Sequence, residues 1–263
     1  WSHNRYRAYY PWTIGGAVWS MYDYNRGCCD NICYSGLADL FRLPKFGLLY
    51  FRTQMKEGTF TPAGPMTYEV FINSHWLEGS SDTLQVYGNV DEVKLQLNGR
   101  VIARQYPDDK PSTSEYVSRP DGGNAENIDF PPFTFFNVNW ERGELKAIGY
   151  KDGKAVAEHV VRTPGAVEAM DITYFESGVS ASCRDLLIVY VNLKDLQGTG
   201  CFGENNREVK LEVLQGGELR GPATIKAEAG VASFLVATTD SPMLVLKAVS
   251  GNLETMRKLK LKK

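Results

Sequence analysis

The sequence has no long apolar run and no excess of charge of either sign. No stretch of about 18 apolar residues without charge occurs, so no membrane insertion is predicted. The 29 Lys and Arg residues nearly balance 31 Asp and Glu residues, with a net charge of −2. This balance does not indicate nucleic acid or an anionic membrane as a partner. The chain begins at Trp1 without a signal-peptide pattern, and we expect it to be part of a longer protein.

The sequence also lacks the common nucleotide and metal motifs. It contains no glycine-rich phosphate or dinucleotide loop and no H-E-x-x-H, and its three histidines lie in no recognisable motif. We therefore predict no cofactor and no metal site, and we expect His159, in an alternating strand, to lie at the surface. The five cysteines cannot all pair. Cys183 and Cys201 either bridge two strands or remain free buried thiols.

What the chain contains is enough sequence for about two domains and part of a third. Its 263 residues are 43% hydrophobic and 23% charged, which is typical of globular proteins. The stretch 61–65 (TPAGP) and the pair Pro164-Gly165 interrupt the pattern and read as boundaries. We therefore divide the chain into residues 1–60, 61–165 and 166–263.

The first segment reads as one βα unit. Residues 13–22 (TIGGAVWSMY) form an apolar run typical of a strand buried on both faces, as in a parallel sheet. A loop follows from residue 23 to residue 36. Pro44 then suits the first turn of a helix with an apolar face at residues 46–51. One such unit cannot cover its own strand, so its neighbouring strands are expected upstream of residue 1.

The two later segments read as β-sandwiches. Alternating strands surround Asn98-Gly99 and Asp152-Gly153, which predict tight hairpin turns. Residues 107–127 read as a long polar surface loop. The final residues, RKLKLKK, alternate Leu with Lys, which favours an edge strand protected by lysines, or alternatively a tail for nucleic acid or anionic lipid. The residues therefore predict a mainly β fold, in which a terminal βα unit of something larger is followed by two β-sandwiches.

Two residues of the first segment are candidates for chemistry. Asp23 directly follows the predicted strand, where barrel enzymes place catalytic and substrate-binding groups. It could cap a loop, contact a substrate or act as an acid. Trp19 lies near the end of the same strand and could present its ring face to a sugar, or pack in the barrel core.

Two segments resemble glycoside hydrolase family 2, the β-galactosidase and β-glucuronidase family. Residues 15–25 (GGAVWSMYDYN) resemble the family's last barrel strand. Residues 32–45 (ICYSGLADLFRLPK) resemble the segment G-[LV]-x-D-x-x-R-x-P-K that enters the last barrel helix, most closely in a bacterial β-galactosidase-like branch. Residues 90–99 and 143–154 resemble the immunoglobulin-like module that follows the barrel in that branch. The fold that the resemblance implies is mainly β, with two immunoglobulin-like β-sandwiches preceded by the last βα unit of a (β/α)8 barrel.

The resemblance implies a substrate site but no catalytic residue in this chain. Trp19 is expected to form the floor of the −1 sugar subsite, with Asp23, Tyr24 and Asn25 at its mouth. The family's two catalytic glutamates lie on earlier strands, so they are expected upstream of residue 1. Ile32 and Ser35 stand where long β-galactosidases have a Phe and an Asn near a sodium ion, which does not favour a sodium site.

The resemblance implies a retaining exo-glycosidase that hydrolyses terminal β-galactosides, of which this chain alone is inactive. Its partner would be a β-linked oligosaccharide, with no nucleic acid, and family habit suggests a periplasmic or secreted bacterial protein. Two alternatives remain open. The sandwiches could bind carbohydrate themselves through the loop residues Asp108, Asp109, Tyr116, Asn124 and Asn127. They could also be structural, bracing a barrel or forming a homo-oligomer interface.

Overall fold

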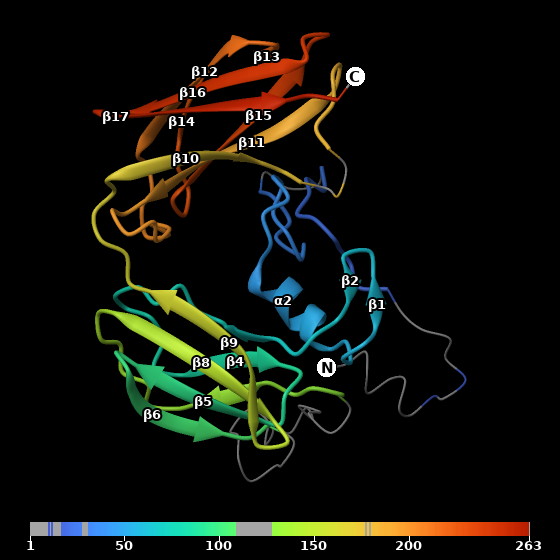
Figure 1. Cartoon of the computed structure of the whole chain (residues 1–263), viewed down its shortest axis with the longest axis vertical. Coiled ribbons are helices and arrows are strands. Elements are labelled where there is room, and N and C mark those ends of the chain that lie inside the picture. Colours follow the sequence, from blue (N-terminus) through green and yellow to red (C-terminus); the bar gives the residue numbers. More distant parts are fainter. Residues whose placement is uncertain are drawn as a thin grey trace. The chain divides into compact units, whose positions relative to one another are not determined.

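The computed structural model describes residues 10, 12, 17–27, 31–108, 128–176, 178 and 180–262. The chain divides into two compact units, Trp1–Thr163 and Pro164–Lys263 (Figure 1). The mainly β fold class is confirmed. The first unit holds both the α2 region and a sandwich, so the predicted division near residue 60 stays a prediction. No helix in the described part of the chain is long and apolar enough to cross a membrane.

The sandwich of the first unit consists of two antiparallel sheets. One sheet has the order β3-β4-β7 and the other β6-β5-β8-β9. Their strands are β3 (Val70–Ile72), β4 (Leu84–Gly88), β5 (Glu92–Leu97), β6 (Arg100–Gln105), β7 (Phe133–Phe135), β8 (Glu144–Lys151) and β9 (Lys154–Arg162). Alternate residues point inward in β4, β5 and β8, so that Val86, Leu95 and Leu145 share one core around Trp76.

The helix α2 (Phe46–Thr53) packs against β3 and β4 of this sandwich. Tyr50 contacts Tyr87 with ring centroids 5.4 Å apart, and burial raises the pKa of Tyr50 to about 12. Pro44 lies before the N-cap residue Lys45 rather than in the first turn. The predicted linker at 61–65 forms a two-residue hairpin of β1 (Phe60–Thr61) and β2 (Gly64–Pro65).

The predicted strand at 13–22 is only partly described. Residues 17–22 form no strand there, and Val18, Trp19 and Met21 are exposed. Tyr22 makes an isolated parallel bridge to Ala38. The expected burial on both faces is therefore not found for residues 17–22, because no neighbouring strand covers them among the described residues.

We expected His159 at the surface, but its side chain is partly buried. Its Nδ1 accepts a hydrogen bond of 3.2 Å from the Ile72 backbone N–H, and its ring packs edge-on against Phe71. The bond joins β9 to β3 and thus links the two sheets. The alternating sequence of β9 does not indicate this contact, because it comes from the other sheet, which covers one end of β9.

We expect this bond to make the first unit sensitive to acid. Burial lowers the pKa of His159 below 6.5, and His75 shifts in the same direction. Their neutral forms stabilise the fold fully above pH 6.5, and this stability is lost as pH falls through the lower folded pKa values. His159→Gln should therefore reduce the fall in melting temperature between pH 7.5 and 5.5.

Tryptophan fluorescence can follow this melting, because all five tryptophans lie between residues 1 and 140. Lys154→Gln, at an exposed position of the same strand β9, is the control, and it should leave the pH dependence as it is. An unchanged slope in His159→Gln would contradict the assignment.

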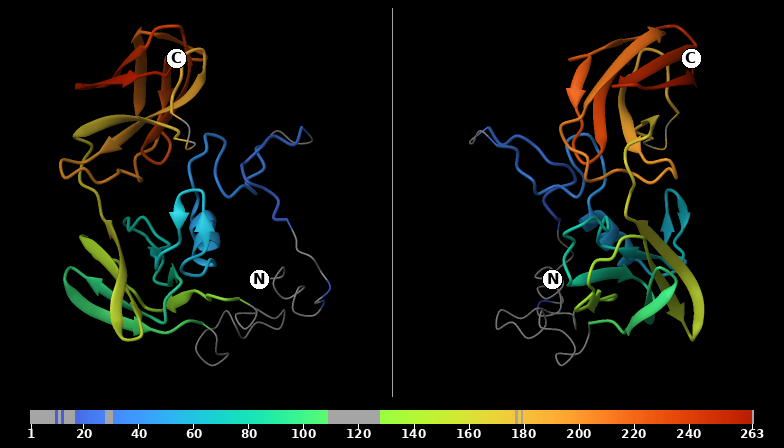
Figure 2. Two further views of the ribbon diagram at one scale, coloured as in Figure 1. Left: turned by 45° about the vertical axis from the view of Figure 1, so that its right-hand side comes forward. Right: turned by 90° about the vertical axis from the view of Figure 1, so that its left-hand side faces the viewer.

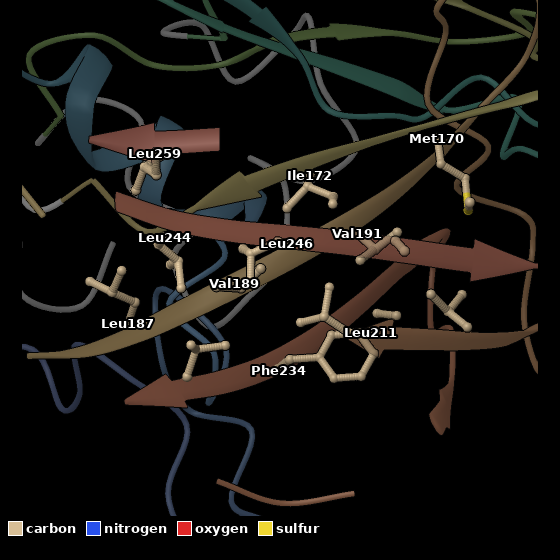
Figure 3. Close-up of a cluster of buried hydrophobic side chains, with 14 of the residues drawn as sticks. Met170, Ile172, Leu187, Val189, Val191, Leu211, Phe234, Leu244, Leu246 and Leu259 are labelled. Carbon is tan, nitrogen blue, oxygen red and sulfur yellow. The ribbon is translucent and has the colours of Figure 1, made fainter. Parts of the chain in front are cut away.

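The second unit is a sandwich of two four-stranded antiparallel sheets (Figure 2). One has the order β10-β11-β15-β13 and the other β14-β12-β16-β17. Their strands are β10 (Ala169–Tyr174), β11 (Leu186–Lys194), β12 (Glu208–Gln215), β13 (Gly217–Leu219), β14 (Thr224–Lys226), β15 (Val231–Thr238), β16 (Met243–Ser250) and β17 (Leu253–Lys260). Val189, Leu211, Phe234 and Leu246 project between the sheets into one core (Figure 3).

The structure describes three of the cysteines and the C-terminal Leu-Lys pattern. Cys183 and Cys201 are free, as is Cys33, while Cys28 and Cys29 lie outside the described residues. β17 is an edge strand, as the Leu-Lys alternation predicted, with Leu259 buried and its lysines exposed.

Candidate functional site

The candidate site residues lie on a short backbone pairing between residues 20–24 and 33–38. Ala38 N–H donates to the Met21 carbonyl at 2.9 Å, and Asp23 N–H donates to the Ala38 carbonyl at 3.0 Å. Cys33 N–H donates to the Tyr24 carbonyl at 2.9 Å. These bonds join the two segments that resemble family 2, so the structure brings the two motifs together.

Trp19 is exposed and held by Tyr24. The Trp19 side chain is 75% exposed, and its Nε1–H donates to the Tyr24 hydroxyl at 2.7 Å. The two rings meet edge-to-face with centroids 5.9 Å apart. Both alternatives for Trp19, the barrel core and the sugar contact, stay predictions. In the described residues the indole is oriented by one hydrogen bond and keeps an accessible apolar face. Such a face can pack against the C–H groups of a sugar ring.

Asp23 is turned inward. It is 4% exposed, and its Oδ1 accepts from the Gly36 N–H at 2.8 Å and from the Lys45 Nζ at 2.6 Å. These bonds tie the end of the 20–24 segment to the start of α2, which is the capping alternative. A substrate contact by Asp23 stays a prediction.

Gly36 and Lys45 are the residues that the sequence interpretation missed. A Cβ at Gly36 would lie 2.2 Å from the Asp23 backbone nitrogen, so only glycine allows this approach. Lys45 also donates to the Tyr34 carbonyl at 3.2 Å. Both residues lie in the segment 32–45 that resembles family 2. The only available signal was Asp23 itself, because a carboxylate at a tight turn is stabilised by a backbone N–H donor and a nearby cation.

The remaining candidates are local. Asn25 Oδ1 accepts from the Gly27 N–H at 2.8 Å, which closes a turn. The Cys33 Sγ lies 3.5 Å from the Ser35 hydroxyl, and this hydrogen bond is the main cause that lowers the pKa of the thiol. No group of acidic, His or Cys side chains in the described ranges could hold a metal ion.

The segment that carries Trp19 exposes several apolar side chains. Exposed side chains in residues 18–41 include Val18, Met21, Tyr34, Leu40 and Phe41, each 40–75% exposed. Apolar patches of this kind mark surfaces that pack against protein or ligand. The segment therefore presents one oriented indole together with further exposed apolar side chains.

The predicted loop at 107–127 is described only at its first two residues. Asp108 is 2% exposed, and it accepts hydrogen bonds from the Thr134 N–H and hydroxyl. It therefore fastens the loop start to β7. Asp109, Tyr116, Asn124 and Asn127 lie outside the described residues.

Comparisons with known proteins point in one direction. A domain family described as "Domain of unknown function (DUF4982)" matches residues 79–157. The chain is 31% identical over 258 residues to a β-galactosidase of Thermoanaerobacter pseudethanolicus, covering 91% of this chain and 32% of that protein. It is 27% identical to a β-glucuronidase of Formosa agariphila, covering 76% of this chain and 18% of that protein.

The fold agrees with these relatives. A crystal structure of a glycosyl hydrolase family 2 member from Bacteroides cellulosilyticus superimposes with a TM-score of 0.71 at 17% identity, covering 97% of this chain and 35% of the other. The fold and the identity to the β-galactosidase together support a glycosidase-related portion. The chain belongs to glycoside hydrolase family 2 and corresponds to a C-terminal part of it. It spans about a third or less of the curated relatives that it matches.

Proposed function

We propose that this chain is the C-terminal portion of a retaining exo-glycosidase that hydrolyses terminal β-galactosides. The single observation that carries the proposal is Trp19, an exposed indole oriented by Tyr24 on the segment that resembles the family's last barrel strand. The 31% identity to a β-galactosidase favours a galactoside over a glucuronide.

In this proposal the chain supplies the floor of the sugar site and other segments supply the acids. Retaining glycosidases use two carboxyl groups about 5–5.5 Å apart, one as nucleophile and one as acid/base. Asp23 does not match either role, because Gly36 and Lys45 already engage its carboxylate. The catalytic glutamates would precede residue 1 in a longer protein, whose barrel would pack on the apolar surface around Trp19.

The role of the chain's own residues is then positional. The Trp19 face would pack against the sugar ring, and the Tyr24 hydroxyl would fix the angle of the indole. Asp23 and Lys45 would hold the 20–24 segment in place beneath it. The sandwiches would be non-catalytic. By family habit we propose a periplasmic or secreted location, which cell fractionation tests.

The test uses the complete product of the gene that encodes this chain, with 4-nitrophenyl β-D-galactoside as substrate. Trp19→Ala should lower kcat/KM by about 100-fold, because removing a ring contact worth about 2.7 kcal/mol costs two decades of rate. Trp12→Ala is the matched control, since Trp12 is 76% exposed and packs edge-on against Tyr10. It should change kcat/KM by less than about threefold.

Two outcomes separate the parts of the proposal. Equal activity in Trp19→Ala and the parent would remove Trp19 from the site. Preferential hydrolysis of the 4-nitrophenyl β-D-glucuronide would overturn the galactoside assignment but leave the glycosidase. Proton NMR of the first product should show the β-anomer, as retention requires.

A further inference from the structure

The outer face of the β14-β12-β16-β17 sheet has an uneven distribution of charge. At one end, Lys210 pairs with Glu212 at 2.7 Å and Lys247 pairs with Glu254 at 2.8 Å. At the other end, Lys258, Lys260 and Lys262 are exposed, and no ion pair joins them to any described residue. One end of this face is therefore neutralised and the other is basic.

The three lysines form a regular row. Leu259 and Leu261 are buried at 9% and 3% exposure, so the intervening lysines point outward. Side chains two residues apart on one face of a strand lie about 6.8 Å apart. Lys258 and Lys260 on β17 thus lie about 6.8 Å apart, and Lys262 follows just beyond the end of the strand.

An apolar floor lies beside this row. Lys258 is paired with Val245 and Lys260 with Met243 on β16, and Gln215 of β12 follows on the far side of Val245. Leu214 and Met256, each 52% exposed, border the same face. Edge protection alone explains lysines on β17, but it does not call for apolar side chains next to them.

We propose that this half of the face, lined by Lys258, Lys260 and Lys262 beside Met243 and the exposed Met256, binds a linear polyanionic polysaccharide. Repeated anions along an extended chain match a straight row of cations, whereas a single phosphate needs convergent donors. The apolar side chains would take the sugar C–H surface between the anionic groups. This site is separate from the one around Trp19 and does not depend on the proposed reaction.

Other polyanions fit the same row less well. A nucleic acid would be expected to use aromatic side chains for base stacking, and none of the residues named on this face is aromatic. Anionic lipid surfaces are recognised by clusters of 4–8 basic residues together with apolar anchors such as Trp or Phe, and this row has three lysines. The chain's net charge of −2 also favours a local site over general attraction to polyanions.

Affinity electrophoresis of the full chain in gels with dextran sulfate or neutral dextran tests the proposal. Dextran sulfate should retard the chain and neutral dextran should not, and the effect should weaken with salt. Lys258→Gln with Lys260→Gln should raise the Kd about tenfold at unchanged melting temperature, and the matching double Arg variant should keep binding. The control pair is Lys56→Gln with Lys154→Gln, which removes the same charge from exposed positions.

Each result of these binding measurements supports or overturns the proposed site. Equal binding by the parent and the double Gln variant would overturn the site, as would an equal loss in the control pair. If the double Gln variant has a lower melting temperature than the parent, the double Arg variant decides instead. It must then bind dextran sulfate like the parent. Tighter binding of single-stranded DNA or phosphatidylserine vesicles than of dextran sulfate would overturn the polysaccharide assignment.

Discussion

Replacing Trp76 with alanine should destabilise the first unit by about 3–5 kcal/mol, the cost of removing a large aromatic side chain from a core. Trp76 is fully buried among the residues that join the two sheets of that unit. Its Nε1–H donates to the Glu141 carbonyl at 3.0 Å, so the substitution also removes this hydrogen bond. Urea denaturation followed by the fluorescence of Trp140 measures the loss.

The backbone of Trp76 explains why smaller changes should cost less. Its carbonyl accepts from the Thr163 hydroxyl at 2.9 Å and from the Trp140 Nε1–H at 3.3 Å, and every substitution keeps these bonds. Trp76→Phe keeps most of the ring volume and loses only the bond to Glu141, so it should cost about 1–2 kcal/mol. An alanine variant no less stable than the phenylalanine variant would show that the cavity term is absent.

The hairpins could be predicted from the sequence because their signals are local. Asn98 and Gly99 take φ values of 49° and 77°, and Asp152 and Gly153 take 49° and 73°. Both pairs match the left-handed turns that Asn-Gly and Asp-Gly favour. The alternating strands around them were likewise placed correctly, because one face of each strand meets the core.

The contacts of Asp23 and His159 were harder to predict, because each joins residues that are distant in the sequence. Asp23 lies 22 residues before Lys45, and their ion pair is formed by a loop whose path no periodicity indicates. His159 accepts from a residue 87 positions away, across the two sheets. The apolar run at 13–22 predicted burial, yet four of its described residues (17, 18, 19 and 21) are exposed, because burial depends on neighbouring strands rather than on composition.

Replacing Asp195 should destabilise the second unit more than replacing any other acidic residue there. Its side chain accepts three backbone N–H bonds, from Gly165 at 2.8 Å, Gln197 at 3.0 Å and Thr199 at 2.8 Å. The residue is only 3% exposed, so water cannot replace these bonds fully. Asp195→Ala should therefore cost about 3 kcal/mol, from several charge-assisted bonds lost together.

The control for this change is Asp171→Ala. Asp171 accepts from Lys194 and Asn192, but its side chain is 40% exposed, so its loss should cost less than about 1 kcal/mol. No tryptophan lies in residues 164–263, so hydrogen exchange of peptides from that range is the measurement. Equal exchange in the two variants would contradict the role given to Asp195.

The same carboxylate should make the second unit sensitive to acid. The backbone N–H of Gly165, with those of Thr199 and Gln197, lowers the pKa of Asp195 below its ordinary value. A lowered folded pKa stabilises the fold above the unfolded value of about 3.9 and loses this contribution as pH falls through the folded value. Asp195→Asn should remove that acid-induced loss of protection, because an amide keeps an acceptor but does not titrate. Since the lowered pKa arises from bonds to residues 165, 197 and 199, these segments should lose exchange protection first as the parent is acidified.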